Sequence, residues 1–177
     1  LPLIEHPIEV LREREFLPFA SAIAAGVATI MTAHVFIPAL DEERPATLSR
    51  HIVTGLLRDS LGFGGVIVSD DLEMKALANQ YSVTESTMLA IEAGCDVVLI
   101  CSGNYDVQAE ALEALVRRVE TDAVFLRRVE DALQRNRHVK ERYLAPSKAS
   151  PLSPKALGQV LGQEEHRRTA DAMARFA

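Results

Sequence analysis

The 177 residues suffice for one domain with a substantial hydrophobic core, since 48% of them are hydrophobic. The formal net charge of -6 and the pI near 5.4 argue against a general binder of nucleic acid or of anionic membrane surfaces. No apolar stretch approaches the ~20 residues of a membrane-spanning helix, so neither nucleic acid nor a membrane is an expected partner.

The cysteines and the start of the chain bear on the cellular compartment. Cys95 and Cys101 lie in the apolar segment 93–101 and are expected to be two buried free thiols rather than a disulfide or a redox pair. Their spacing fits neither a zinc site nor a CxxC motif, which favours a reducing compartment, and we predict a cytoplasmic location. No signal peptide is visible, but the chain starts at Leu1 rather than Met, so a lost targeting segment stays an alternative.

Helices are predicted for the first 26 residues. Pro7 suits the first position of a helix that runs to about Glu15, and Pro18 then either interrupts this helix or begins a second one. A run rich in β-branched residues at 27–35 follows and predicts a strand, which carries His34 near its end.

Helices and strands continue to alternate in the middle of the chain. The predicted elements are a helix from its N-cap Ser49 to Leu61, a buried strand at 66–68, a helix capped by Thr84 or Ser86, and a strand at 97–101.

The last third of the chain is predicted to be mainly helical. Helices are expected at about 106–120 and 122–143, and the basic end of the second is interpreted as a solvated face; its members are Arg135, Arg137, His138, Lys140 and Arg142. Three prolines and three serines at 145–154 predict a linker before an amphipathic helical tail. We therefore divide the chain into residues 1–145, which hold the sheet, and 146–177, the linker and tail.

Near-continuous apolar strands that alternate with helices predict an α/β fold with a parallel sheet covered on both faces. Three such strands are too few to close a (β/α)8 barrel, which takes about 250 residues. The chain is therefore either a small open sheet or the carboxyl-terminal part of a TIM-like barrel. In both architectures ligands bind at the carboxyl ends of the strands.

Polar side chains follow each predicted strand at its carboxyl end: His34, then Asp70 and Asp71, then Ser102 and Asn104. Asp70 is our candidate reacting group; the alternative is that the two aspartates cap the next helix. Adjacent strand residues point in opposite directions, so one carboxylate should face a pocket while the other caps or pairs. They therefore cannot be the two opposed carboxylates of a retaining glycosidase, ~5–5.5 Å apart, and a second catalytic group must come from elsewhere.

The other candidates at this edge have structural alternatives. His34 either contacts substrate or is a hydrogen-bonded histidine that positions other groups. Met74 is assigned to the substrate-binding set, although packing is the commoner role for Met74 and Met31. No cluster of histidines or cysteines has ligand spacing, and the glycines at 62–65 precede their strand, so neither a metal nor a cofactor is predicted.

Six segments appear in an order that resembles glycoside hydrolase family 3, most closely its bacterial β-N-acetylglucosaminidases that trim cell-wall muropeptides. The segments are EFLPF (15–19) with AIAAG (22–26), IMTAHV (30–35), PALD (38–41), PATLS (45–49), GFGGVIVSDDLEM (62–74) and AGCD (93–96). The resemblance covers roughly residues 1–105.

The resemblance implies a (β/α)8-like barrel and retaining hydrolysis of terminal β-linked N-acetylglucosamine. It identifies Asp70 as the nucleophile, Asp71 as a supporting neighbour that orients the strand end or caps the next helix, and His34 as a residue near the pocket. The family's Lys-His-Phe-Pro-Gly-His-Gly motif and its acid/base loop have no match here. We therefore expect the other part of the barrel in the same protein or assembly. The alternatives are a non-catalytic carbohydrate-binding or interaction fragment and, more weakly, an unrelated small α/β domain in which Asp70 holds a metal.

Overall fold

The computed structural model of the protein describes residues 1–144 and 153–175. The chain divides into two compact units, Leu1–Leu144 and Ala145–Ala177. The predicted domain boundary at residue 145 and most of the predicted linker lie outside the described residues. The second unit contains α7 (Pro154–Val160) and α8 (Glu164–Ala174), in agreement with the predicted helical tail.

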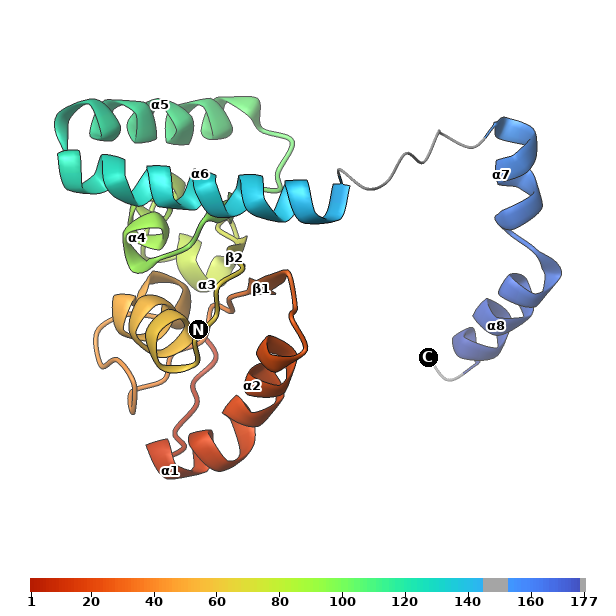
Figure 1. Cartoon of the computed structure of the whole chain (residues 1–177), viewed down its shortest axis with the longest axis horizontal. Coiled ribbons are helices and arrows are strands. Elements are labelled where there is room, and N and C mark those ends of the chain that lie inside the picture. Colours follow the sequence, from red (N-terminus) through yellow and green to blue (C-terminus); the bar gives the residue numbers. More distant parts are fainter. Residues whose placement is uncertain (145–152, 176–177) are drawn as a thin grey trace. The chain divides into compact units, whose positions relative to one another are not determined.

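The first unit is built on a parallel sheet with the strand order β1-β2-β3 (Figure 1). These strands are β1 (Thr29–Met31), β2 (Val66–Asp71) and β3 (Val97–Leu99). The predicted α/β class and the three parallel strands are thus confirmed. The first strand is shorter than the predicted run at 27–35.

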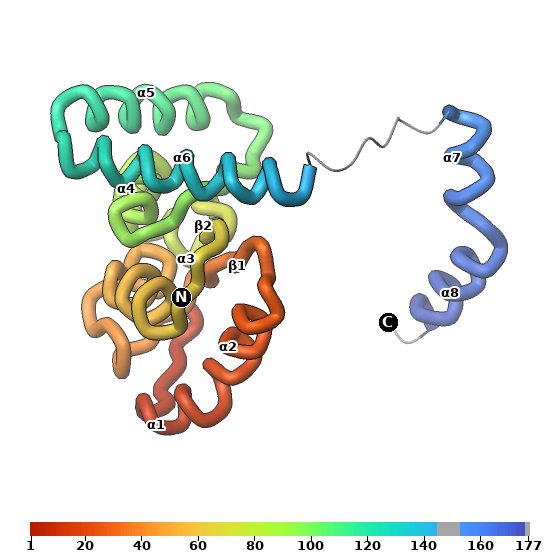
Figure 2. Tube along the Cα trace, viewed as in Figure 1, coloured from red at the N-terminus to blue at the C-terminus, as the bar shows by residue number. Residues whose placement is uncertain are grey.

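Helices precede, connect and follow the strands. They are α1 (Ile8–Val10), η1 (Leu11–Glu15), α2 (Phe16–Ala24), η2 (Ala46–Leu48), η3 (His51–Ser60), α3 (Lys75–Ala78), α4 (Val83–Ala93), α5 (Tyr105–Thr121) and α6 (Ala123–Leu144). The trace shows α5 and α6 side by side, with α4 packed against them (Figure 2). Residues 8–24 form one continuous helical run in which η1 has π-helical hydrogen bonding, with the Phe16 N–H donating to the Leu11 carbonyl, just before Pro18; Pro18 therefore interrupts the regular α-helix, as one alternative held.

Helix α4 begins earlier than predicted and ends at a glycine. The Ser82 hydroxyl caps it by accepting a hydrogen bond from the Glu85 N–H at 3.1 Å, so the prediction of Thr84 or Ser86 as the cap was wrong. Ser86 lies inside the helix and is buried. Gly94 ends the helix with a φ of +126°, and a Cβ at this position would meet Thr54 Oγ1 at 2.6 Å, so both backbone conformation and space require glycine.

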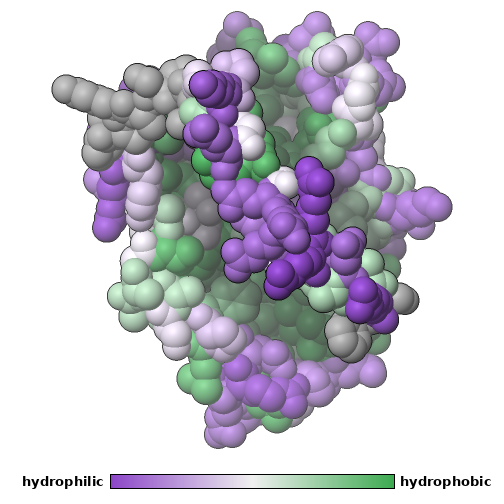
Figure 3. All heavy atoms as spheres, turned by 90° about the vertical axis from the view of Figure 1, so that its right-hand side faces the viewer, coloured by the Kyte–Doolittle hydropathy of each residue, from purple (hydrophilic) through white to green (hydrophobic). Residues whose placement is uncertain are grey.

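The core lies between the sheet and its covering helices. Its fully buried members include Leu48, Ile67, Leu72, Leu77 and Cys95. Burial of each large aliphatic side chain contributes about 1.5–3 kcal/mol. One view of the surface shows hydrophilic side chains interrupted by apolar patches (Figure 3). In the parts of the chain that the structure describes, no helix is both long and apolar enough to cross a bilayer.

The two thiols have different environments. Cys95 is buried in the core, whereas Cys101 is exposed just past β3, so the expectation of two buried thiols was wrong for Cys101. The strand ends at Leu99, two residues earlier than predicted, and this places Cys101 outside the sheet. Both thiols are free, as expected.

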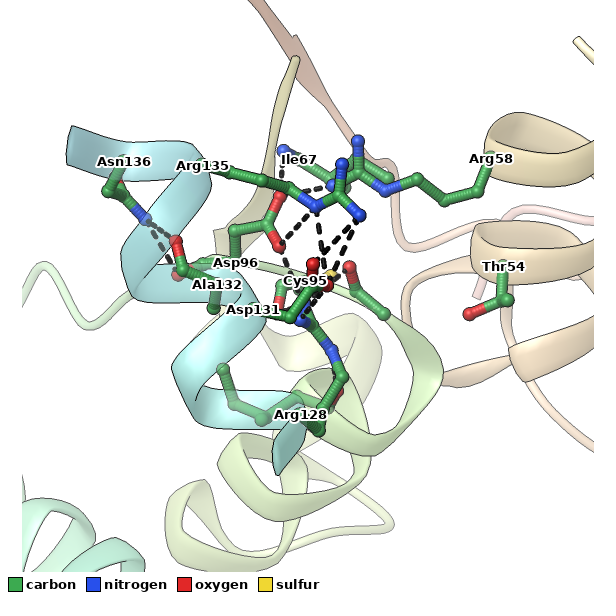
Figure 4. A network of polar contacts seen from close by, with 12 residues as sticks. Thr54, Arg58, Ile67, Cys95, Asp96, Arg128, Asp131, Ala132, Arg135 and Asn136 are labelled. Carbon is green, nitrogen blue, oxygen red and sulfur yellow. Dashed lines mark hydrogen bonds and ion pairs between the residues drawn. The ribbon is translucent and has the colours of Figure 1, made fainter. Parts of the chain in front are cut away.

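A buried carboxylate connects several elements at the amino end of the sheet (Figure 4). The Asp96 side chain is completely buried, and its Oδ2 accepts hydrogen bonds from the Ile67 N–H at 2.8 Å and from Arg58. Its Oδ1 accepts from Arg128 Nη2 at 2.6 Å. One side chain thus ties together η3, β2 and α6.

The arginines around Asp96 are largely removed from solvent. Burial lowers the pKa of Arg58, while the adjacent charge of Asp96 opposes this effect, and an arginine so paired stays protonated at neutral pH. Arg135 donates three hydrogen bonds to the Asp131 carboxylate, and its Nε lies 3.9 Å from Asp96. The interpretation of this basic helix end as a solvated face was therefore wrong for Arg135.

We predict that Asp96→Asn lowers the free energy of unfolding by about 3 kcal/mol or more, because the arginine charges would lose their buried counter-ion. Urea denaturation followed by circular dichroism measures the change. The control is Asp131→Asn, whose side chain is 46% exposed and whose loss should cost less than about 1 kcal/mol. Equal losses in the two variants would contradict the central position of Asp96.

The thiols give a second prediction. Burial raises the pKa of Cys95 to about 12, so almost none of this thiol is thiolate at mildly alkaline pH. Iodoacetamide should therefore modify Cys101 in the folded protein and both cysteines in guanidinium chloride, as peptide mass spectrometry would measure. Modification of Cys95 at an equal rate under native conditions would show that the core is more open than described.

Candidate active site

The carboxyl end of β2 contains an irregularity in the sheet. Val68 pairs with Val97 and Asp71 pairs with Leu99, so β2 advances by three residues while β3 advances by two. The extra residue forms a β-bulge at Ser69 and Asp70. Bulges are rare in parallel sheets, occur preferentially beside active sites, and redirect a side chain there.

Ser69 joins the bulge to the neighbouring strand. Its side chain is completely buried, and its Oγ accepts a hydrogen bond from the Leu99 N–H at 3.0 Å. Regular backbone pairing resumes at once, because the Leu72 N–H donates to the Leu99 carbonyl at 2.9 Å. The irregularity is therefore confined to the two residues at the bulge.

The two aspartates differ in their partners. Asp71 Oδ1 accepts hydrogen bonds from the N–H groups of Glu73 at 3.2 Å and Cys101 at 3.1 Å. Asp70 is half-buried, and its Oδ1 accepts from the Asp71 N–H at 2.8 Å. Among residues 1–144 and 153–175, no group donates to its Oδ2. This arrangement suits a supporting Asp71 and a reacting Asp70, and both roles stay predictions.

His34 is buried next to the carboxyl end of β2, and both of its ring nitrogens are hydrogen-bonded. It is 4% exposed; its Nε2 lies 2.9 Å from the Asp71 carbonyl, and its Nδ1 lies 2.8 Å from Thr47 Oγ1. Because a carbonyl only accepts, Nε2 carries a proton, and Nδ1 is hydrogen-bonded to the Thr47 hydroxyl. The Thr47 hydroxyl is in turn hydrogen-bonded to the Thr32 hydroxyl at 2.9 Å. This geometry favours the positioning alternative for His34, and its direct contact with a substrate stays a prediction.

The methionines are less buried than a packing role requires. Met74 is 43% exposed and follows the two aspartates, and its N–H donates to the Asp71 carbonyl at 3.1 Å. Met31, at the end of β1, is 54% exposed. An exposed thioether next to the strand end is available for contact with a ligand, so the assignment of Met74 to substrate binding stays a prediction.

The loop after β3 is held by a residue that the sequence interpretation missed. Glu73 Oε2 accepts a hydrogen bond from the Ser102 N–H at 2.6 Å, which ties this loop to the end of β2. Asn104, predicted at the site, caps α5 by accepting from the Asp106 N–H at 3.1 Å. The position of Glu73, three residues past Asp70, was the available signal, but its partner is distant in the sequence.

An apolar hollow of about 310 Å³ lies elsewhere in this unit, lined by residues of η1, α2, β1 and η3 among others. Its lining includes Phe16, Phe19, Met31 and Leu56 and neither aspartate. Within the described residues, no group of three or more His, Cys, Asp or Glu side chains is arranged to hold a metal ion.

Comparison with known proteins defines the class. The family model of the glycosyl hydrolase family 3 N-terminal domain matches residues 1–139, and the chain belongs to this family. A β-hexosaminidase of Xylella fastidiosa (strain 9a5c) is 38% identical over 120 residues, which are 68% of this chain and 35% of that protein. The chain thus spans about a third of the length of the curated relatives it matches.

Solved structures agree with this assignment. The glycoside hydrolase family 3 β-N-acetylglucosaminidase from Paenibacillus sp. str. FPU-7 superposes with a TM-score of 0.81 at 41% identity, over 87% of this chain and 30% of that one. The β-N-acetylglucosaminidase from Thermotoga maritima gives a TM-score of 0.72 at 37% identity, over 85% of this chain and 32% of that one. The first unit therefore corresponds to a portion of a larger enzyme fold.

We predict that His34→Ala lowers the free energy of unfolding by about 1–3 kcal/mol, because the Asp71 carbonyl and the Thr47 hydroxyl would lose their buried partner. Thermal and urea denaturation measure the effect. The exposed His51 supplies the matched control, and His51→Ala should change stability by less than about 0.5 kcal/mol. Unchanged stability of the His34 variant together with a raised KM would instead favour direct substrate contact.

Proposed function

We propose that this chain is part of a retaining glycoside hydrolase that removes terminal β-linked N-acetylglucosamine, with Asp70 as the nucleophile. The observation that carries the proposal is the bulged end of β2, where the Asp70 carboxylate keeps an oxygen without a hydrogen-bond donor among the described residues. Names of relatives support the substrate class, since curated relatives are called β-hexosaminidases.

The proposed reaction has two steps. An Asp70 oxygen attacks the anomeric carbon, the bond from this carbon to the leaving-group oxygen breaks, and a covalent glycosyl ester forms. Water then attacks the same carbon, which releases the sugar and restores the carboxylate. The leaving oxygen takes a proton in the first step, and the attacking water loses one in the second.

The proton donor is proposed to come from outside this chain. Asp71 and Glu73, the carboxylates next to Asp70 in the sequence, each accept hydrogen bonds from backbone amides in the described structure. These hydrogen bonds hold both side chains against the backbone of the strand end and the loop after β3, and the family's acid/base loop has no match in this chain. We therefore propose that the acid/base group belongs to the other part of the barrel, in the same protein or in another chain of the assembly.

The natural substrate and the cellular location of the protein are part of the same proposal. We propose cell-wall muropeptides with a terminal N-acetylglucosamine as the natural substrates, on the basis of the resemblance of the motifs. Release of N-acetylglucosamine from purified muropeptides, followed by mass spectrometry, tests this point. A cytoplasmic location is proposed from the two free thiols, and cell fractionation tests it.

The nucleophile assignment makes a direct prediction. A fluorinated N-acetylglucosaminide inactivator should label Asp70, and Asp70→Ala should lower kcat on an aryl N-acetyl-β-glucosaminide by about 10⁴-fold or more while the protein stays folded. Peptide mass spectrometry locates the label, and initial rates give kcat.

The control variant is Asp59→Ala, which removes an exposed carboxylate of η3 and should keep full activity. Label on another residue, or an active Asp70→Ala variant, would refute the assignment. Saturable binding of N-acetylglucosamine without turnover by an assembly that includes the whole barrel would support the alternative of a non-catalytic carbohydrate-binding protein.

A further inference from the structure

We infer that Ser69 is a positioning residue for Asp70, because its hydroxyl holds the β-bulge that aims this carboxylate. The inference rests on the proposed function, in which Asp70 is the nucleophile. It assigns a role to a residue that makes no contact with the reacting atoms.

The bulge is bounded by regular pairing on both sides. Before it, the Asp96 N–H donates to the Ile67 carbonyl at 2.8 Å; after it, the Leu72 N–H donates to the Leu99 carbonyl at 2.9 Å. The extra residue of β2 is therefore absorbed within Ser69 and Asp70. Ser69 Oγ is the side-chain acceptor that reaches β3 at this point.

The bulge also changes which way the side chains face. Along β2, buried and half-buried residues alternate from Ile67 to Asp70, and Asp71 breaks the alternation by being half-buried as well. A regular strand would send the two aspartates to opposite faces. The bulge lets Asp71 reach the Cys101 amide, while Asp70 Oδ2 has no donor in the part of the chain that the structure describes.

Asp70 takes its orientation from its neighbours. Asp71 is fastened through His34 to the segment that follows β1 and through Cys101 to the loop that follows β3, and Ser69 is fastened to β3 through Leu99. The Asp70 side chain itself accepts one local hydrogen bond, from the Asp71 N–H. A nucleophile held this way depends on both flanking anchors, and a displacement of about 1 Å can cost about 10²-fold in rate.

The test compares Ser69→Ala with wild type in the protein that carries the full barrel. Loss of the anchor should lower kcat by about 10- to 100-fold and change KM by less than about threefold, since substrate binding keeps its own contacts. The rate of covalent labelling by the fluorinated N-acetylglucosaminide should fall in parallel. Hydrogen exchange of the Leu99 amide should become about tenfold faster, since its acceptor is gone.

Two controls separate positioning from general destabilisation. Ser86 is also completely buried, and its hydroxyl has no partner among the described residues, so Ser86→Ala should keep kcat and stability. Thr54 donates to the carbonyl of Ala93, the last residue of α4, at 2.6 Å. Thr54→Val should therefore lower stability about as much as Ser69→Ala and leave kcat unchanged.

A volume-matched variant addresses packing. Ser69→Cys keeps a side chain of similar size but replaces the oxygen with a weak acceptor, so it should behave like Ser69→Ala. Wild-type kcat in Ser69→Cys would show that volume alone matters and would overturn the inference.

Failure of the role of Ser69 and failure of the proposed function would give different results. Unchanged Leu99 exchange in Ser69→Ala, or a loss of stability without a loss of kcat, would overturn the role of Ser69 while wild type still turns over substrate and is labelled on Asp70. Failure of the proposed function looks different, because wild type would then show no turnover or carry the label on another residue, and the inference would fall with it.

Discussion

The register of the sheet depends on Asp96. Its N–H donates to the Ile67 carbonyl and its Oδ2 accepts from the Ile67 N–H, both at 2.8 Å, so one residue holds β2 and β3 together in both directions. The surrounding arginines fix the carboxylate itself, and truncating such a group would leave buried charges unpaired. With the register set at the amino end, the extra residue of β2 is absorbed toward the carboxyl end. The bulge at Ser69 and Asp70 is the result.

Different kinds of interaction thus hold the two ends of the sheet. The amino end is held by charge, through a carboxylate and arginines that are largely buried. The carboxyl end is held mainly by hydrogen bonds that backbone amides donate, one of them to Ser69 Oγ, and by the hydrogen bond from His34 Nε2 to the Asp71 carbonyl. This division matches the general pattern of barrel folds, in which one face stabilises and the other carries out chemistry.

Membership of glycosyl hydrolase family 3 explains the fold, but a fold does not by itself define a function. The bulge, the partners of Asp71 and the enclosed His34 are what connect this chain to nucleophilic chemistry. The neighbouring acids also differ in their partners: backbone amides from other positions donate to Asp71 and Glu73, while Asp70 accepts only a local hydrogen bond in the described chain.

The sequence alone determined the α/β class, the parallel strands and the candidate residues at their carboxyl ends. These features follow from local signals: apolar runs, helical spacing and polar residues after each strand. The structure contains the elements that these signals predict. Only the tertiary structure decided that Ser82 rather than Ser86 caps α4, that Cys101 is exposed and that Arg135 faces Asp131 and Asp96. It also decided that His34 is enclosed and that Ser69 reaches Leu99. The physical reason is that these features depend on contacts between residues far apart in the chain or on where an element begins or ends. Local sequence periodicity predicts neither.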